Sequence, residues 1–296
     1  MLVEKYIIYL ALILVGLCLG SFSGALMWRL RARQLAQDKH DGEKIDHDEF
    51  ERLNKLNSAS ILSPKDHSVC LNCSYRLKWY DLIPLFSWLY LGGRCRRCHK
   101  RIGRMEPLME IGMVAYFVLS FMFWPYPLNN WLEISRLVLW LIAGVPIAIL
   151  FAYDARWSLM DRKANYSLVL VGAISALTVI LNSSDKSSTF FGICGSVLIL
   201  GGLYYAIYRL SNGKWVGGAD PVLGLGLGLM LADWRLAFVA LFAANLIGCL
   251  VVIPGLATKK LKRDSHVPFG PLLITGFIIA GLAGNYLIEF YINSFL

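Results

Sequence analysis

Two aspartates stand at positions where an ionisable side chain is costly. Asp154 ends a long apolar run, and Asp220 begins another directly after three small residues, Gly217, Gly218 and Ala219. Charged side chains at the ends of membrane-spanning stretches are expensive to bury, so they are functional candidates by default. The small residues leave room beside Asp220 for a peptide strand or an unwound helix end.

A pair of carboxylates at such a place could hydrolyse a peptide bond. If Asp154 and Asp220 meet within about 4 to 6 Å, they share one proton. The ionised member then takes a proton from water while the protonated member polarises the scissile carbonyl. The alternative is that Asp154 is a solvated residue at the membrane boundary and Asp220 caps a helix. Pro221, which follows Asp220, is suited to a first helical turn. We interpret the other aspartates of these loops as ordinary loop residues: Asp161, Asp233 and Asp264.

Four cysteines form two C-x-x-C pairs, separated by twenty-one residues: Cys70, Cys73, Cys95 and Cys98. This spacing is typical of a four-thiolate zinc site, and thiolate ligands favour zinc. With no ligand position left for water, the metal would be structural. A redox-active dithiol is the alternative, although one C-x-x-C pair would suffice for that. His99 is adjacent but is not expected to be a ligand.

Composition indicates a membrane protein. Of the 296 residues, 57% are hydrophobic and only 17% are charged, which is unusual for a water-soluble domain of this length. Apolar runs close to the length needed to cross a bilayer recur along the chain. They predict an all-α membrane protein of about eight transmembrane helices: 6–28, 107–125, 132–153, 166–182, 190–208, 219–232, 236–254 and 268–292. Lone cysteines within these runs are interpreted as packing residues: Cys18, Cys194 and Cys249.

Basic residues are sorted by loop. Four segments, 29–106, 154–164, 209–217 and 255–266, contain 25 of the 29 Lys and Arg residues. The positive-inside rule therefore predicts that these segments face the cytoplasm and that both termini lie outside it. Because the charge of +9 is distributed in this way, it indicates membrane orientation and no nucleic-acid partner.

We expect three parts: a first transmembrane helix (1–28), a cytoplasmic insert with the zinc site (29–106) and a seven-helix core (107–296). The first apolar run is kept as a helix because no cleavage site follows it. Within the insert, residues 38–51 are rich in acids and are interpreted as a solvated arm. Attraction of a basic substrate segment is the alternative.

Several patches resemble the bacterial type IV prepilin peptidases, and the resemblance extends over nearly the whole chain. It is carried by Gly20–Leu30, by the block from Cys70 to Glu110, by Gly217-Gly-Ala-Asp220, which resembles the G-x-G-D motif, and by His266–Pro271. The resemblance places the two catalytic carboxylates at Asp154 and Asp220. It implies prepilin or pseudopilin substrates with short basic leaders, cleaved at the cytoplasmic face of a bacterial inner membrane.

The resemblance also implies a second activity, N-methylation of the new amino terminus with S-adenosylmethionine. No glycine-rich fingerprint for that cofactor is visible, and the weak candidates for contacting it are Gly92, Gly93 and Glu110. Alternatives are a peptidase without methyltransferase activity, a transporter that uses the aspartates as a proton relay, and a catalytically silent assembly factor.

Overall fold

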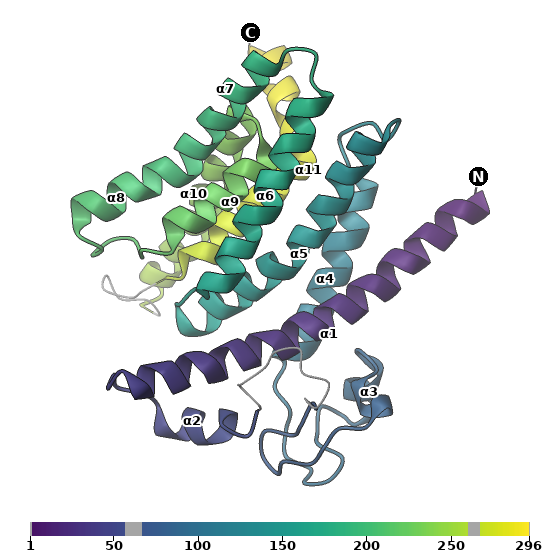
Figure 1. Cartoon of the computed structure of the whole chain (residues 1–296), viewed down its shortest axis with the longest axis vertical. Helices are drawn as coiled ribbons and strands as arrows, with labels where there is room; N and C mark the ends of the chain where they lie inside the picture. The colour runs from purple at the N-terminus through teal and green to yellow at the C-terminus, as the bar shows by residue number, and fades with distance from the viewer. Residues whose placement is uncertain (1, 57–66, 260–266, 296) are drawn as a thin grey trace. The chain divides into compact units, whose positions relative to one another are not determined.

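The chain is helical in the computed structural model, which describes residues 2–56, 67–259 and 267–295 (Figure 1). The only extended pairings within these residues are two isolated bridges, so the all-α class is confirmed. In chain order the elements are α1 (Leu2–His40), α2 (His47–Leu53), η1 (Trp79–Leu82), α3 (Phe86–Tyr90), α4 (Met105–Met122), α5 (Trp131–Trp157), α6 (Arg162–Asn182), α7 (Lys186–Val197), η2 (Leu198–Gly202), α8 (Leu203–Ser211), α9 (Asp220–Leu231), α10 (Trp234–Ala257) and α11 (Phe269–Phe295).

Seven helical segments in the described part of the chain are long and apolar enough to cross a membrane, the run from α7 through η2 to α8 counting as one. The remaining expected span, 219–232, is helix α9, which has only 12 residues. A helix of that length is about 18 Å long, shorter than a hydrocarbon core of about 30 Å. The chain is thus a multi-pass membrane protein in which the sixth of the expected spans is a short helix.

The chain forms two compact units, residues 1–118 and 119–296. In the first unit, helix α1 continues without a break past residue 28 as far as His40. Its last turns carry Arg31, whose guanidinium pairs with Glu49 of α2 at 2.7 Å in a mostly buried position. The extension and α2 also share a small apolar core built around Leu35 and Leu53. Part of the acidic segment is therefore ordered against α1.

In the second unit, helix α9 is surrounded by α6, α7, α8, α10 and α11. Three of its glycines allow this close packing. A Cβ at Gly224 would overlap the carbonyl of Leu200 in η2, and a Cβ at Gly228 would come within 3.0 Å of the Ser196 carbonyl oxygen. Gly226 makes the equivalent approach to α6 on another side. Small residues let membrane helices approach closely, and here they place α9, which begins with Asp220, inside the bundle.

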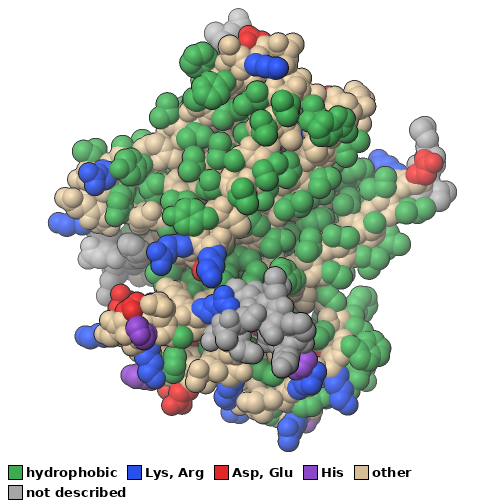
Figure 2. Space-filling view, in the orientation of Figure 1, with side chains coloured by type: hydrophobic (Ala, Val, Ile, Leu, Met, Phe, Trp, Pro, Cys, Tyr) green, Lys and Arg blue, Asp and Glu red, His purple; other side chains and the backbone are tan. Residues whose placement is uncertain are grey.

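Large apolar side chains cover the outside of the helices (Figure 2). Such a surface suits contact with lipid rather than water. Charged side chains are sparse over this apolar face, in agreement with the membrane assignment.

Candidate functional site

Asp154 lies in the last turn of α5 and is only 5% exposed. Its Oδ2 accepts a hydrogen bond of 2.8 Å from the backbone N–H of Gly270, near the start of α11. Helix α5 ends immediately afterwards at Ser158, which adopts a left-handed conformation. The carboxylate is therefore held at the end of its helix by a residue 116 positions further along the chain.

Asp220 is the first residue of α9 and is partly exposed. Its Oδ2 accepts a hydrogen bond of 2.8 Å from the backbone N–H of Gly217. Gly217 and Gly218 are both exposed, whereas the carbonyl of Ala219 accepts a hydrogen bond from Asn165 of α6. The loop before Asp220 is thus held by Asn165 at Ala219, and its backbone is exposed at Gly217 and Gly218.

The start of α11 connects the surroundings of the two aspartates. Gly270 donates to Asp154, and the ring of the preceding residue, Phe269, lies 5.0 Å from the ring of Tyr204 in α8. Tyr204 in turn interacts electrostatically with Asp220. Helix α11 packs against both α5 and α9. The start of α11 therefore lies beside Asp154 at the end of α5 and, through Phe269, beside the start of α8, whose Tyr204 is near Asp220 at the start of α9.

Gly270 cannot be replaced without a clash. A Cβ at this position would lie 2.7 Å from Oδ2 of Asp154 and 2.6 Å from the terminal carbon of Met160. The absence of a side chain is what allows the backbone of α11 to reach the carboxylate. This glycine belongs to one of the patches that carry the family resemblance, but its contact with Asp154 is not readable from the sequence.

Asn165 is a second residue that the sequence did not single out. It is 2% exposed, and its Nδ2 donates to the Ala219 carbonyl at 3.2 Å. Its Oδ1 is buried and accepts no hydrogen bond from the described residues. An asparagine within an apolar helical run gives a weak signal, and its tertiary partner gives none. Asn165 holds the residue directly before Asp220.

The other aspartates cap helices. Asp161 accepts from the backbone N–H of Ala164 at the start of α6, and Asp233 accepts from that of Arg235 at the start of α10. N-cap carboxylates satisfy amide groups that a helix leaves unpaired. Asp264 and His266 lie outside the described residues.

In the first unit the four cysteines come together. Their sulfur atoms all lie within 4.8 Å of one another, and the Cys70–Cys98 and Cys73–Cys95 pairs are each separated by 3.9 Å. Four sulfurs bound to zinc at about 2.3 Å in a tetrahedron lie about 3.8 Å apart. The cluster could therefore hold a metal ion. His99 does not belong to it.

The two cysteine pairs are built by the same local fold. In each, the residue after the second cysteine, Ser74 or His99, has a positive φ, and its backbone N–H donates to the carbonyl of the first cysteine. An antiparallel bridge closes each turn, between Val69 and Arg76 in one and between Arg94 and Arg101 in the other. The positive φ of His99 shows that it is a turn residue.

The local environment shifts the pKa values of two of the cysteine thiols in opposite directions. Burial raises the pKa of the Cys70 thiol to about 12. Burial also acts to raise the pKa of Cys95, but hydrogen bonds from the backbone amides of Cys98 and Arg97, and from the neighbouring thiols, lower it to about 7. Because metal ligation requires thiolates, a bound cation would displace the thiol protons.

The three candidate cofactor residues differ in their surroundings. Glu110 is buried in α4, and its Oε2 accepts from the backbone N–H of Leu85 at 2.8 Å. Gly93 has a positive φ, and a Cβ there would lie 2.9 Å from the Trp88 ring. Gly92 also has a positive φ but faces open space. Glu110 and Gly93 thus make contacts within the protein, whereas Gly92 is open to a ligand.

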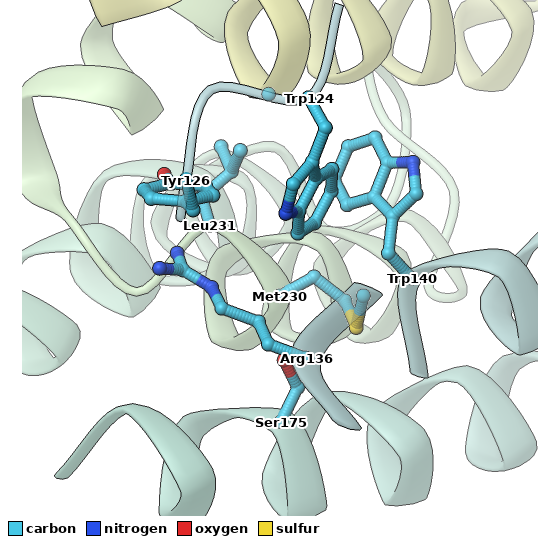
Figure 3. Close-up of a pocket in the computed structure, with 8 residues that line it drawn as sticks. Trp124, Tyr126, Arg136, Trp140, Ser175, Met230 and Leu231 are labelled. Atoms are coloured by element: carbon cyan, nitrogen blue, oxygen red, sulfur yellow. The ribbon is translucent and has the colours of Figure 1, made fainter. Parts of the chain in front are cut away.

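A small cavity lies between α5, α6, α9 and α11, with Arg136 and Trp140 among its lining residues (Figure 3). It has room for about one water molecule. Arg136 and Asp154 are 18 positions apart on α5, about 27 Å along the helix axis. This cavity is therefore too small for a peptide and lies far from the aspartates.

A family model described as the bacterial peptidase A24 N-terminal domain matches residues 14–124. This range includes all four cysteines and ends before both aspartates. No solved structure matches the chain.

Similar proteins cover nearly the whole chain. A type 4 prepilin-like proteins leader peptide-processing enzyme of Escherichia coli is 28% identical over 285 residues, which is 92% of this chain and 91% of the relative. A prepilin leader peptidase/N-methyltransferase of Aeromonas hydrophila is 25% identical over 98% of this chain and 96% of its own length. One of Pseudomonas aeruginosa is 24% identical, with coverage of 96% and 93%.

Proposed function

The chain belongs to the type IV prepilin peptidase family, and from that premise we propose that it cleaves the leader from prepilins or pseudopilins with Asp154 and Asp220. The observation that carries the proposal is the contact of the α11 start with the surroundings of both carboxylates: Gly270 bonds to Asp154, and Phe269 packs against Tyr204 beside Asp220.

The chemistry follows from a pair of carboxylates that share one proton. The ionised member removes a proton from the attacking water, and the protonated member donates to the scissile carbonyl oxygen. The roles reverse when the amine leaves. The exposed backbone at Gly217 and Gly218 offers an extended peptide a path beside Asp220, while the Asn165 bond to Ala219 keeps that loop in place.

The basic loops support the orientation of the site. Arg156 in the last turn of α5, Arg162 at the start of α6 and Lys214 before α9 lie next to the two aspartates in sequence. By the positive-inside rule these helix ends face the cytoplasm. Both termini then lie on the other side of the inner membrane, which requires the short helix α9 to carry the chain across together with the seven longer spans. A prepilin keeps its basic leader in the cytoplasm, so its cleavage point would lie at the depth of Asp154 and Asp220.

Zinc is the metal that we propose for Cys70, Cys73, Cys95 and Cys98, since four thiolates at tetrahedral spacing favour it. It would stabilise the insert and take no part in hydrolysis. The cytoplasmic insert then extends over residues 29–106, between the first transmembrane helix (1–28) and the membrane core (107–296).

N-methylation of the new amino terminus is the second activity that we propose, because the similar proteins of A. hydrophila and P. aeruginosa are named as N-methyltransferases. S-adenosylmethionine would supply the methyl group. Of the candidate residues only Gly92 is left facing open space, so no step is assigned to Glu110 or Gly93.

The test uses the purified full-length protein with a prepilin in lipid vesicles, read by the mass of the products. We expect Asp154→Asn and Asp220→Asn each to reduce cleavage by about 10³-fold or more, as loss of a catalytic group does. Asp185→Asn, which alters only the cap of α7, should leave cleavage unchanged. Retained cleavage in either active-site variant would reject the dyad. Adding S-adenosylmethionine to the wild type reports the methyl group in the same spectrum.

A further inference from the structure

A cluster of exposed apolar side chains lies on the first unit, outside the cysteine site and the proposed dyad. We call it the α3 patch: Trp79, Leu82, Ile83, Phe86, Leu89 and Tyr90. Trp79 is 77% exposed, Phe86 69% and Tyr90 82%. Figure 2 shows apolar side chains gathered over the region that Figure 1 labels α3. Apolar surface of this kind, on a segment with charged neighbours, indicates a contact with a membrane or another molecule.

The position of the α3 patch relative to the membrane follows from one hydrogen bond. The N–H of Leu85, directly before α3, donates to Glu110 at 2.8 Å. Glu110 lies five residues inside α4, one of the helices long and apolar enough to cross the bilayer. Five residues correspond to about 7.5 Å along the helix axis. The start of α3 is therefore attached to the first turns of a helix that can cross the bilayer, near the end at which that helix begins.

The backbone geometry also indicates a specific attachment of α3 to the beginning of α4. Leu85 adopts a positive φ of 58° although it has a side chain, a conformation that needs compensating contacts. On the other side of α3, Gly93 fits against Trp88, whose indole N–H donates to the Gly103 carbonyl, just before α4. Both ends of α3 are thus connected to the beginning of α4.

The composition of the region matches an interfacial segment. Tryptophan and tyrosine prefer the boundary between lipid and water, and exposed cations attract anionic headgroups. Exposed Arg94, Arg97, Lys100, Arg101 and Arg104 follow the patch in sequence. Arg96 is paired with Asp81 and is not needed for this attraction.

We propose that the α3 patch inserts into the headgroup region of the bilayer on which the cysteine-bearing insert rests, and that lipid is its resident partner. The α3 segment then acts as an interfacial anchor that holds the insert against the membrane surface. This proposal concerns lipid binding and does not depend on the peptidase activity.

The test places the photo-crosslinking residue p-benzoylphenylalanine at single positions of the full-length protein. The protein is reconstituted in vesicles of phosphatidylethanolamine and phosphatidylglycerol, irradiated and examined by mass spectrometry. Phe86 and Tyr90 are the test positions, and Tyr90 is so exposed that its replacement disturbs no packing. Glu51, exposed on α2, is the matched control.

We expect phospholipid adducts at both test positions to exceed those at Glu51 by about tenfold. Lipid adducts no more frequent than at Glu51 would overturn the proposal, as would crosslinks to the protein alone. Crosslinks that move to a prepilin when one is added would assign the patch to the substrate and would also reject lipid as its partner. Cleavage of the prepilin by the same preparations reports separately on the peptidase.

Discussion

The cysteine cluster of the first unit and the aspartate site of the second are assembled in different ways. Each cysteine pair is shaped by its own turn, with a positive-φ residue and one bridge, and the same turn occurs twice within about thirty residues. The aspartates lie at the ends of two helices, 66 positions apart, and depend on α6, α8 and α11 for their surroundings. The first site is fixed mainly by local sequence and the second by helix packing.

The two sites should therefore be sensitive to different substitutions. With the proposed zinc bound, the order of the first unit depends on the four cysteines and the metal, because the small insert has little apolar core of its own. The aspartate site depends on close backbone approaches at Gly224 and Gly270, where even a methyl group does not fit. Substitution of the cysteines should therefore affect only the first unit, and substitution of Gly224 or Gly270 should affect the second.

The largest effect is expected from removing metal ligands. Cys70→Ser together with Cys98→Ser should abolish metal binding, and structural zinc contributes on the order of 10 kcal/mol to the folding of small domains. Elemental analysis measures the metal, and limited proteolysis measures the order of residues 67–103. Cys249→Ser, at an exposed lone cysteine, is the control and should keep the metal. An ordered insert without metal would contradict the account of the first unit.

The next effect concerns the packing of α9. Gly224→Ala would drive a methyl group into the Leu200 carbonyl, and overpacking of this kind costs about 1–3 kcal/mol. The thermal midpoint of the purified protein should fall. Gly112→Ala in α4 meets no atom within 4 Å and should leave the midpoint unchanged or slightly higher. Equal midpoints for the two variants would show that α9 is not closely packed.

A smaller effect is expected at Asn165. Asn165→Asp keeps the shape but removes the donor to the Ala219 carbonyl, so the Asp220 loop should loosen and kcat for prepilin should fall about tenfold, equivalent to a bond of roughly 1.4 kcal/mol. KM should change little. Asn245→Asp, where the side chain bonds only to its own helix, is the matched control. An unchanged kcat would remove Asn165 from the site.

The smallest effect is expected in the acidic segment. Glu43, Asp48 and Glu51 are exposed and Asp38 is partly exposed, and charges at the surface are screened by salt. If they attract a basic leader, neutralising all four should raise KM about twofold at low salt and not at high salt. An unchanged KM at low salt would show that the segment does not attract the leader. Its role would then be structural, through the ion pair of Glu49 with Arg31 and the Asp46 cap of α2.

Much of this molecule could be predicted from its sequence. The apolar runs identified the long helices of the described residues, and the cysteine spacing identified the four-cysteine cluster, because both signals are local. The extension of α1 to His40 was not expected, since its polar residues conceal the packing of Leu35 against Leu53. Asn165 and the contact of Gly270 with Asp154 were also missed. Each depends on a partner that is distant in sequence, and neither residue type signals one.

Whether Asp154 and Asp220 act as one unit is tested most directly by a double-mutant comparison of prepilin cleavage. The account predicts that Asp154→Asn combined with Asp220→Asn loses no more activity than the more damaging single change, because groups that share a proton are not additive. All three variants should keep their metal. Losses that add on a logarithmic scale would contradict a shared proton and reject the dyad.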